Sequence, residues 1–323
     1  MPHYLLTGGC GFIGSHLAAA LLARGDRVRI LDDLSTGNRA NLAPGAELVV
    51  GDVSDPATVA AAMAGVDGCF HLAAIASVER GVREWLLTHR VNLSGTIAVF
   101  DAARATDATR AAGPIPVVYA SSAAVYGEQE TLPITEEAPK TPLSAYGADK
   151  LGCEQQAKVA GHVHGVPTMG LRFFNVYGPR QDPKSPYSGV ISIFCDRLSA
   201  REPVNIFGDG SQTRDFIYVA DIVAGLLAAM DKADVSAPVL NLCTGQPTSV
   251  LELARLVAAL CNAPHALDHA PPRSGEIRHS VGAPDRARAM LGLGAPTPLR
   301  EGLAATLAWL RTGRPGLAPV GQG

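Results

Sequence analysis

Short aliphatic runs alternate with longer alanine-rich stretches along the first half of the chain. The short runs are typical of β-strands because they are rich in branched residues and bounded by Gly, Pro or Asp. They cover residues 3–7, 28–31, 47–50, 68–72, 115–121 and 168–174. Helical stretches are predicted between them, the first from about Ser15 and another near Pro56. Because parallel strands need a helical crossover, this order predicts an α/β fold with a doubly wound parallel sheet.

The pattern changes after the strand predicted at residues 168–174. Residues 177–187 are rich in Gly, Pro and charge and are predicted to form a binding loop. Further strands are predicted at 203–208 and 238–242, a return segment at 215–230, and a helix that Ser249 and Glu252 open as a capping box. We therefore expect one domain over residues 1–170 with a return at 216–243, a smaller α/β lobe over 171–215 and 244–311, and a disordered Gly- and Pro-rich tail over 312–323.

Composition excludes several classes of protein. With 323 residues, 47% of them hydrophobic and 18% charged, the chain can bury a core, and 27 Lys and Arg against 30 Asp and Glu do not predict a nucleic-acid surface. No apolar run approaches the ~18 to 20 residues of a membrane helix, and no basic segment precedes the first strand, so we expect a cytoplasmic protein without membrane spans. The six cysteines and nine histidines are dispersed, which predicts neither a disulfide framework nor a metal site.

A glycine motif lies between the first strand and the first helix. Gly8, Gly11 and Gly14, with Gly9, place backbone N–H groups and a helix N-terminus where a pyrophosphate can bind. Asp32 ends the second strand about 20 residues on, where its carboxylate can accept ribose hydroxyls. The same charge repels a 2′-phosphate, so the pair of features predicts NAD rather than NADP. The alternative for the glycines is an ordinary tight turn.

Two other acids follow predicted strands. Asp52, after the third strand, could reach the adenine amino group or cap the next helix. Asp33, beside Asp32, is better explained as a solvated loop residue.

The chemistry is predicted from Ser122, Tyr146 and Lys150. Residues four apart share a helix face, so Lys150 should lie one turn from the Tyr146 phenol, and Ser122 ends the fifth strand at the carboxyl edge of the sheet. A lysine and an oxidised nicotinamide nearby favour the deprotonated phenol, which can then take a proton from an alcohol while Ser122 hydrogen-bonds the substrate oxygen. The alternative is a surface Tyr and Lys with a buried Ser.

These residues and a series of longer motifs resemble the extended short-chain dehydrogenase/reductase family and, within it, the NAD-dependent sugar-nucleotide epimerases. The resemblance spans about residues 3–310 and rests on TGGCGFIGSH, LDDL, GDV, FHLAA, SSAAVYG, YGADK, LRFFNVYGPR, TRDFIYV and RSGEIRHS. It implies a Rossmann-type domain with a smaller substrate-binding lobe. It also implies a set of NAD contacts, namely Gly8, Gly11, Phe12, Ile13, Gly14, Asp32, Asp52, Val53, Leu72, Ala73, Ala74, Asn92, Tyr146 and Lys150.

The resemblance also implies a UDP-sugar site. Asn175, Arg214 and Arg273 are expected at the diphosphate, Glu276 at the uridine ribose and Phe216 near the uracil, and the remaining members of the set are Ser122, Tyr146, Val190 and Ser280. Guanidinium groups suit a diphosphate because they bind it in a bidentate way, although each arginine could instead form a surface salt bridge. The family usually has Asp where this chain has Glu276.

The residues after Ser122 narrow the expected reaction. The resembling 4,6-dehydratases carry an Asp-Glu pair where this chain has Ala123 and Ala124, and the decarboxylases carry Glu at the second position. We therefore expect 4-epimerisation of UDP-glucose and UDP-galactose. Ser280 stands where a bulky tyrosine blocks acetamido sugars in the family, so UDP-GlcNAc and UDP-GalNAc are also candidate substrates, while a loop-capping role is the alternative for this serine.

Other activities and the oligomeric state stay open at this point. The alternatives are a UDP-glucuronate 4-epimerase, another nucleotide-sugar oxidoreductase or dehydratase, and a non-catalytic NAD sensor. Helices expected around Val91–Ala105 and Tyr146–Gly161 are apolar on more than one face. In the resembling enzymes such helices pair across a two-fold axis, which implies a homodimer, although a buried core helix would show the same pattern.

Overall fold

The computed structural model describes residues 1–104, 113–183, 185, 189–263, 267–272 and 277–312. Its main feature is a seven-stranded sheet in the order β3-β2-β1-β4-β5-β6-β10, in which every neighbouring pair is parallel. The strands are β1 (His3–Thr7), β2 (Arg27–Asp32), β3 (Glu47–Val50), β4 (Gly68–His71), β5 (Val117–Ser122), β6 (Thr168–Phe173) and β10 (Val239–Leu242). The doubly wound sheet predicted from the sequence is confirmed.

Helices cover both faces of this sheet because successive side chains of each strand point to opposite sides. On one face, Val118 of β5 is buried in a core that includes residues of α1, α8 and α10. On the other face, Val117 and Tyr119 are buried in a second core with residues of α2, α5 and α6. These helices are α1 (Phe12–Ala23), α8 (Val219–Met230), α10 (Asp285–Leu291), α2 (Pro56–Met63), α5 (Gly95–Arg104) and α6 (Ala145–His164). The first helix begins at Phe12, three residues before the predicted start, because the glycine turn leads directly into it.

Local caps fix the ends of these helices. Asp55 accepts a hydrogen bond from Ala57 N and so caps α2, whose first residue is Pro56. Ser144 caps α6 by accepting from Gly147 N at 3.1 Å, and Gly165 ends α6 at φ 65°. Asp52 does not cap α2, so that alternative from the sequence was wrong.

The strand order creates the expected binding edge. From β1 the chain moves outward through β2 and β3 and then crosses back to β4 on the other side of β1. Ligands of such sheets bind outside the carboxyl ends of the strands at the point where the direction reverses. Shorter elements line the connections there: η1 (Arg39–Asn41), α3 (Val78–Arg83), α4 (Trp85–His89), the π-helical turn η2 (Arg90–Ser94) and η3 (Ala123–Val125).

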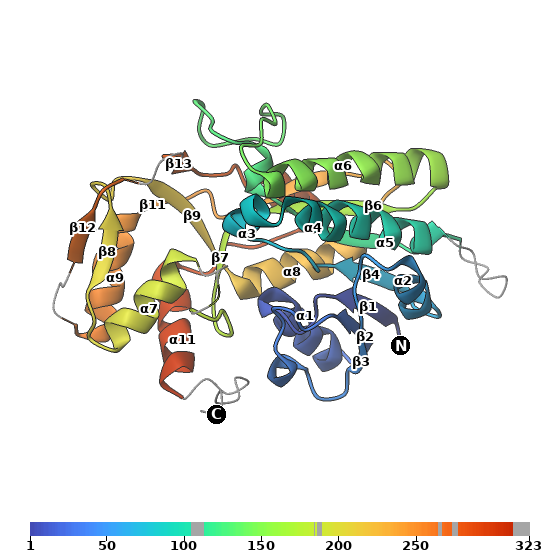
Figure 1. Ribbon diagram of the computed structural model, residues 1–323, viewed down its shortest axis with the longest axis horizontal. Coiled ribbons are helices and arrows are strands. Elements are labelled where there is room, and N and C mark those ends of the chain that lie inside the picture. The colour runs from blue at the N-terminus through green and yellow to red at the C-terminus, as the bar shows by residue number, and fades with distance from the viewer. Residues whose placement is uncertain (105–112, 184, 186–188, 264–266, 273–276, 313–323) are drawn as a thin grey trace.

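A smaller group of elements from the second half of the chain lies beside this sheet, on the left of Figure 1. Here β9 (Thr213–Tyr218) pairs with β7 (Asn175–Tyr177), β11 (Pro247–Ser249) and β13 (His279–Ser280), and β8 (Val204–Phe207) pairs with β12 (Leu267–Ala270). Three helices, α7 (Val190–Ser199), α9 (Val250–Cys261) and α11 (Leu299–Arg311), share one core with these strands. The capping box at Ser249 and Glu252 is confirmed in both directions.

One boundary of the predicted lobe was wrong. Residues 244–311 do not all belong to it, because Ala287 and Leu291 of α10 are buried in the core of the main sheet. The tail from residue 313 and residues 184, 186 and 187 of the predicted binding loop lie outside the described residues. Within the described ranges, no helix combines the length and the apolar character needed to cross a membrane.

Candidate active site

The turn from β1 to α1 has two glycine positions, Gly8 and Gly14, at which a side chain would collide with the backbone. Gly8 has φ 72°, and a Cβ there would lie 2.8 Å from Ala73 N. A Cβ on Gly14 would collide with the Gly8 carbonyl oxygen, which also accepts a hydrogen bond from Gly11 N. Gly11 has no side chain to cap α1, so the N–H groups at Phe12 and Ile13 begin a helix suited to an anion.

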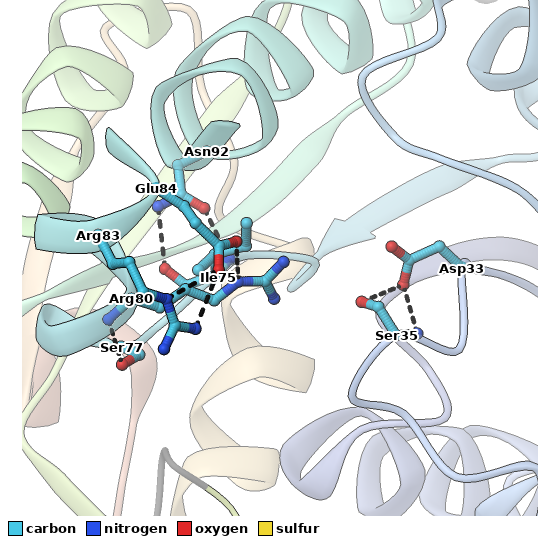
Figure 2. A network of polar contacts seen from close by, with 8 residues as sticks. All are labelled: Asp33, Ser35, Ile75, Ser77, Arg80, Arg83, Glu84 and Asn92. Carbon is cyan, nitrogen blue, oxygen red and sulfur yellow. Dashed lines mark hydrogen bonds and ion pairs between the residues drawn. The ribbon is translucent and has the colours of Figure 1, made fainter. Parts of the chain in front are cut away.

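Asp32 connects this turn to the end of β2. Its buried carboxylate accepts hydrogen bonds from Cys10 N and Leu34 N, both at 2.9 Å. Burial raises the pKa of Asp32, while these two hydrogen bonds act against that shift. Each oxygen retains a further acceptor position, which suits the ribose hydroxyls of NAD. Neighbouring Asp33 is exposed and closes a turn onto Ser35 (Figure 2), as expected for a solvated loop acid.

The loop after β4 is held against β1 by a buried hydroxyl that the sequence analysis did not single out. Leu72 N and Ala73 N both donate to Thr7 Oγ1 at 3.2 Å, and His71 Nδ1 lies 2.7 Å from the same oxygen. Burial and the nearby Lys150 lower the pKa of His71 to about 3, so the imidazole is neutral.

The hydrogen bonds on the far side of His71 fix its tautomer. Thr96 donates its hydroxyl proton to the Asn92 carbonyl oxygen at 2.6 Å, so His71 Nε2 must donate to Thr96 Oγ1 at 3.0 Å. The Nδ1 atom of His71 therefore accepts from Thr7. The histidine therefore links Thr7 at the end of β1 to Thr96 of α5 by two buried hydrogen bonds.

Asn92 is buried and its amide is engaged with the backbone of one residue. Its Oδ1 accepts from Ile75 N at 2.7 Å and its Nδ2 donates to Ile75 O at 3.0 Å, as Figure 2 shows. The same view shows Ser77 accepting from Arg80 N at the start of α3. Asn92 thus fixes the loop that includes Ala74.

The two predicted contacts after β3, Asp52 and Val53, follow the carboxyl end of that strand. Asp52 accepts from Ser54 N at 2.8 Å in a local turn, and Val53 is buried against Gly95 of α5.

Ser122, Tyr146 and Lys150 are brought to one region by β5 and α6. Ser122 ends β5 and caps η3, since its Oγ accepts from Ala124 N at 3.1 Å. Tyr146 is in the first turn of α6 and half-buried. Lys150 is 2% exposed; its Nζ donates to Ala120 O at 2.8 Å and lies 5.8 Å from the centre of the Tyr146 ring. The side chain of Lys150, which is on the same helix as Tyr146, is therefore attached to the strand that ends at Ser122.

The predicted substrate residues line one part of the lobe. Arg214 of β9 pairs in register with Ser280 of β13, and its Nη1 donates to Thr213 O at 2.9 Å and Arg278 O at 3.3 Å. Asn175 is exposed on β7, beside the sheet edge.

The remaining substrate residues differ in their surroundings. Val190 begins α7 and is half-buried, and Phe216 is buried in the lobe core. Arg273 and Glu276 lie outside the described residues.

The chain is similar to known proteins over nearly its whole length. The model of the NAD dependent epimerase/dehydratase family matches residues 4–243. A UDP-glucose 4-epimerase of Mycolicibacterium smegmatis is 38% identical over 314 residues, which cover 95% of this chain and 98% of that protein. The crystal structure of a UDP-glucose 4-epimerase of Thermotoga maritima with UDP-glucose is similar with a TM-score of 0.90 at 33% identity, covering 96% of this chain and 99% of that one. A UDP-N-acetylglucosamine 4-epimerase of Methanobrevibacter ruminantium, in complex with UDP-N-acetylmuramic acid, gives 0.89 at 31% identity, covering 97% and 99%.

Proposed function

We propose that this protein interconverts UDP-glucose and UDP-galactose through a transient 4-keto sugar. The premise is that the chain belongs to the NAD-dependent epimerase/dehydratase family and is a nucleotide-sugar epimerase. Bound NAD supplies the hydride acceptor and donor for C4 of the sugar. The glycine turn and the carboxylate of Asp32 would hold its pyrophosphate and its adenosine ribose.

The residues of the chain supply the proton chemistry. Tyr146 would take the proton of the 4-hydroxyl as the ketone forms and return it afterwards. Ser122 Oγ accepts from Ala124 N, which leaves its own proton free to hydrogen-bond the substrate oxygen. Lys150, fixed by the Ala120 carbonyl, retains two N–H groups that can be directed at Tyr146 or at the cofactor ribose.

The observation that carries this proposal is the absence of an acid or base directly after Ser122. Ala123 and Ala124 are the first two residues of η3, the turn after the strand, and their side chains are only methyl groups. Elimination of water from the 4-keto sugar would require a proton acceptor and a proton donor there. Without them, the ketone can only be reduced again, and reduction on the opposite face inverts C4.

Proton NMR of the anomeric region tests the proposal. Purified protein would be incubated with UDP-galactose and, separately, with UDP-glucose, without added cofactor. The expected result is the same equilibrium mixture from both directions. No conversion even after addition of NAD would contradict it.

The substrate range extends, on our proposal, to UDP-GlcNAc and UDP-GalNAc. Ser280 is a small residue opposite Arg214 in the β9–β13 register, so the two side chains lie on the same side of the sheet. Its small size leaves room for an acetamido group beside a bound diphosphate.

We also propose a homodimer formed through α5 and α6. The outer surfaces of these helices expose Ile97 by 40%, Val159 by 45% and Val163 by 63%, and a groove lined by Ile97, Phe100 and Val159 runs between them. Both helices therefore have a buried apolar face toward the sheet and a second apolar face that is exposed, whereas the second face of a core helix would be buried. Light scattering should give twice the chain mass, and Val163→Asp should give the monomer.

A further inference from the structure

A buried ion pair joins α6 to β6, one helical turn beyond Lys150. The side chains of Glu154 on α6 and Arg172 on β6 are 3% and 5% exposed. Arg172 Nε donates to Glu154 Oε1 at 2.8 Å, and Nη2 donates to Oε2 at 2.7 Å. This bidentate geometry is the strong form of the interaction and fixes the two side chains relative to one another.

The pair holds both ends of the segment that contains Ser122. On one side, Ser121 donates its hydroxyl proton to Glu154 Oε1 at 2.6 Å. On the other, Arg172 Nη1 donates to Tyr126 Oη at 2.6 Å, and the guanidinium lies 4.9 Å from the centre of the Tyr126 ring. Residues 122–125 are thus bracketed by two buried attachments to one ion pair.

The second attachment has a defined proton arrangement. Burial raises the pKa of Tyr126 to about 12, so its hydroxyl is protonated and donates to Asn241 Oδ1 at 2.6 Å while it accepts from Arg172. Asn241 in turn donates to the Ile134 carbonyl oxygen at 2.9 Å. All of these groups are buried, so the cost of leaving any of them without a partner restricts the segment to one position.

The same glutamate belongs to the helix of the other two catalytic candidates. Tyr146, Lys150 and Glu154 follow at intervals of four residues and share one face of α6. Lys150 reaches the β5 backbone at Ala120, and Glu154 reaches the next residue, Ser121. The helix is therefore attached to the strand at two adjacent positions, directly before Ser122.

We propose that the Glu154–Arg172 pair is a positioning device, which sets Ser122 relative to Tyr146 and Lys150 through the hydroxyls of Ser121 and Tyr126. Glu154, Arg172, Ser121 and Tyr126 are positioning residues and take no part in proton transfer. The inference rests on the proposed epimerase activity. It predicts that loss of either hydroxyl impairs the chemical step and spares binding.

The test uses two mild variants, because removal of Glu154 or Arg172 would leave a buried charge and could prevent folding. Ser121→Ala and Tyr126→Phe each delete one hydroxyl and leave the ion pair in place. Tyr119→Phe is the matched control: the Tyr119 hydroxyl is on the same strand and buried, and it has no hydrogen-bond partner within the described residues. The measurements are kcat and KM for UDP-galactose, bound NAD per chain, and the kinetic isotope effect with UDP-galactose deuterated at C4.

Ser121→Ala and Tyr126→Phe should each lower kcat roughly 10- to 100-fold, the effect of a small misplacement of reacting groups. KM and bound NAD should be unchanged, and the isotope effect should increase because the chemical step becomes more nearly rate-limiting. Tyr119→Phe should match the wild type in all four quantities.

Two results would overturn the inference while leaving the epimerase activity intact. One is an unchanged kcat in both variants. The other is a loss of kcat in proportion to bound NAD with an unchanged isotope effect, which is the behaviour of a merely structural role. A wild-type protein that converts no UDP-sugar would overturn the proposed function and this inference together.

Discussion

Gly147 packs so closely against the Ala124 carbonyl oxygen that a Cβ at this position would lie 2.5 Å from it. Gly147 follows Tyr146 in the first turn of α6, and Ala124 is in η3, which Ser122 caps. The separation of the hydroxyl and the phenol that we assign to catalysis therefore depends on a missing side chain between two backbones.

Substitution of Gly147 by Ala should push α6 away from η3. A backbone carbonyl cannot move aside as a flexible side chain can, so we expect a free energy of unfolding about 1–3 kcal/mol lower, despite the better helix propensity of Ala. We also expect kcat to fall at least about tenfold, because Tyr146 moves with the helix. Urea unfolding and steady-state kinetics measure the two effects.

Gly152→Ala is the control on the same helix. A Cβ there would meet only the end of the Leu93 side chain, at 3.1 Å. Stability and kcat should stay close to the wild-type values. Equal behaviour of the two variants would show that the Gly147 contact has no special role.

Tyr146→Phe should abolish most of the activity without affecting binding. The substitution removes the proton acceptor and leaves the ring, so we expect kcat to decrease about 10²- to 10⁴-fold or more. Bound NAD and the affinity for UDP-sugar should be normal, as measured by absorbance and calorimetry. Turnover near the wild-type rate would mean that another group accepts the proton.

Much of this site could be predicted because its parts are local in sequence. The glycine turn, Asp32, Ser122 and the Tyr146–Lys150 pair each lie at a strand end or on one helix face, where spacing alone gives the orientation. The strands were predicted equally well, since the central ones are short runs of residues that are buried at every position, a property that each run shows by itself.

The errors and omissions concern long-range contacts. Residues 285–291 form an ordinary short helix, and its sequence does not reveal that it packs on the main sheet instead of the lobe. Likewise, nothing local links Glu154 to Arg172, which meet only when α6 lies across β5 and β6. The one local error is the cap of α2, for which the sequence analysis offered Asp52, whereas Asp55, directly before Pro56, is the residue that caps the helix.

Protonation of His71 in the unfolded chain should make the native protein less stable in mild acid. The native pKa is about 3, whereas the unfolded chain titrates near the ordinary value of 6.5. Between these values the unfolded state binds a proton that the native state does not, so this residue's effect on stability is absent above about pH 6.5 and grows as the pH falls. The slope it adds is at most ~1.4 kcal/mol per pH unit.

The measurement is the free energy of unfolding in urea from pH 7 to pH 4, for the wild type and His71→Gln. The substitution removes one titrating group and leaves the buried carboxylates of Asp32 and Asp215 in place, so the difference between the two curves isolates the histidine. The variant should lose less stability per pH unit than the wild type. Parallel curves would contradict a neutral, buried His71.

Ser280→Tyr should separate the two classes of substrate. Ser280 lies beside Arg214 in the β9–β13 register, so a tyrosine would place its ring next to the proposed diphosphate site, in the space that an acetamido group needs. We expect the variant to lose turnover of UDP-GalNAc and to retain turnover of UDP-galactose within a few-fold. Ser280→Ala is the matched control, since it removes the hydroxyl without adding bulk and should leave both activities in place. Both sugars would be measured by NMR under identical conditions. Equal loss of both in the tyrosine variant would mean that residue 280 affects the whole site, and loss of both in the alanine variant would assign the serine a structural hydrogen bond instead of a steric role.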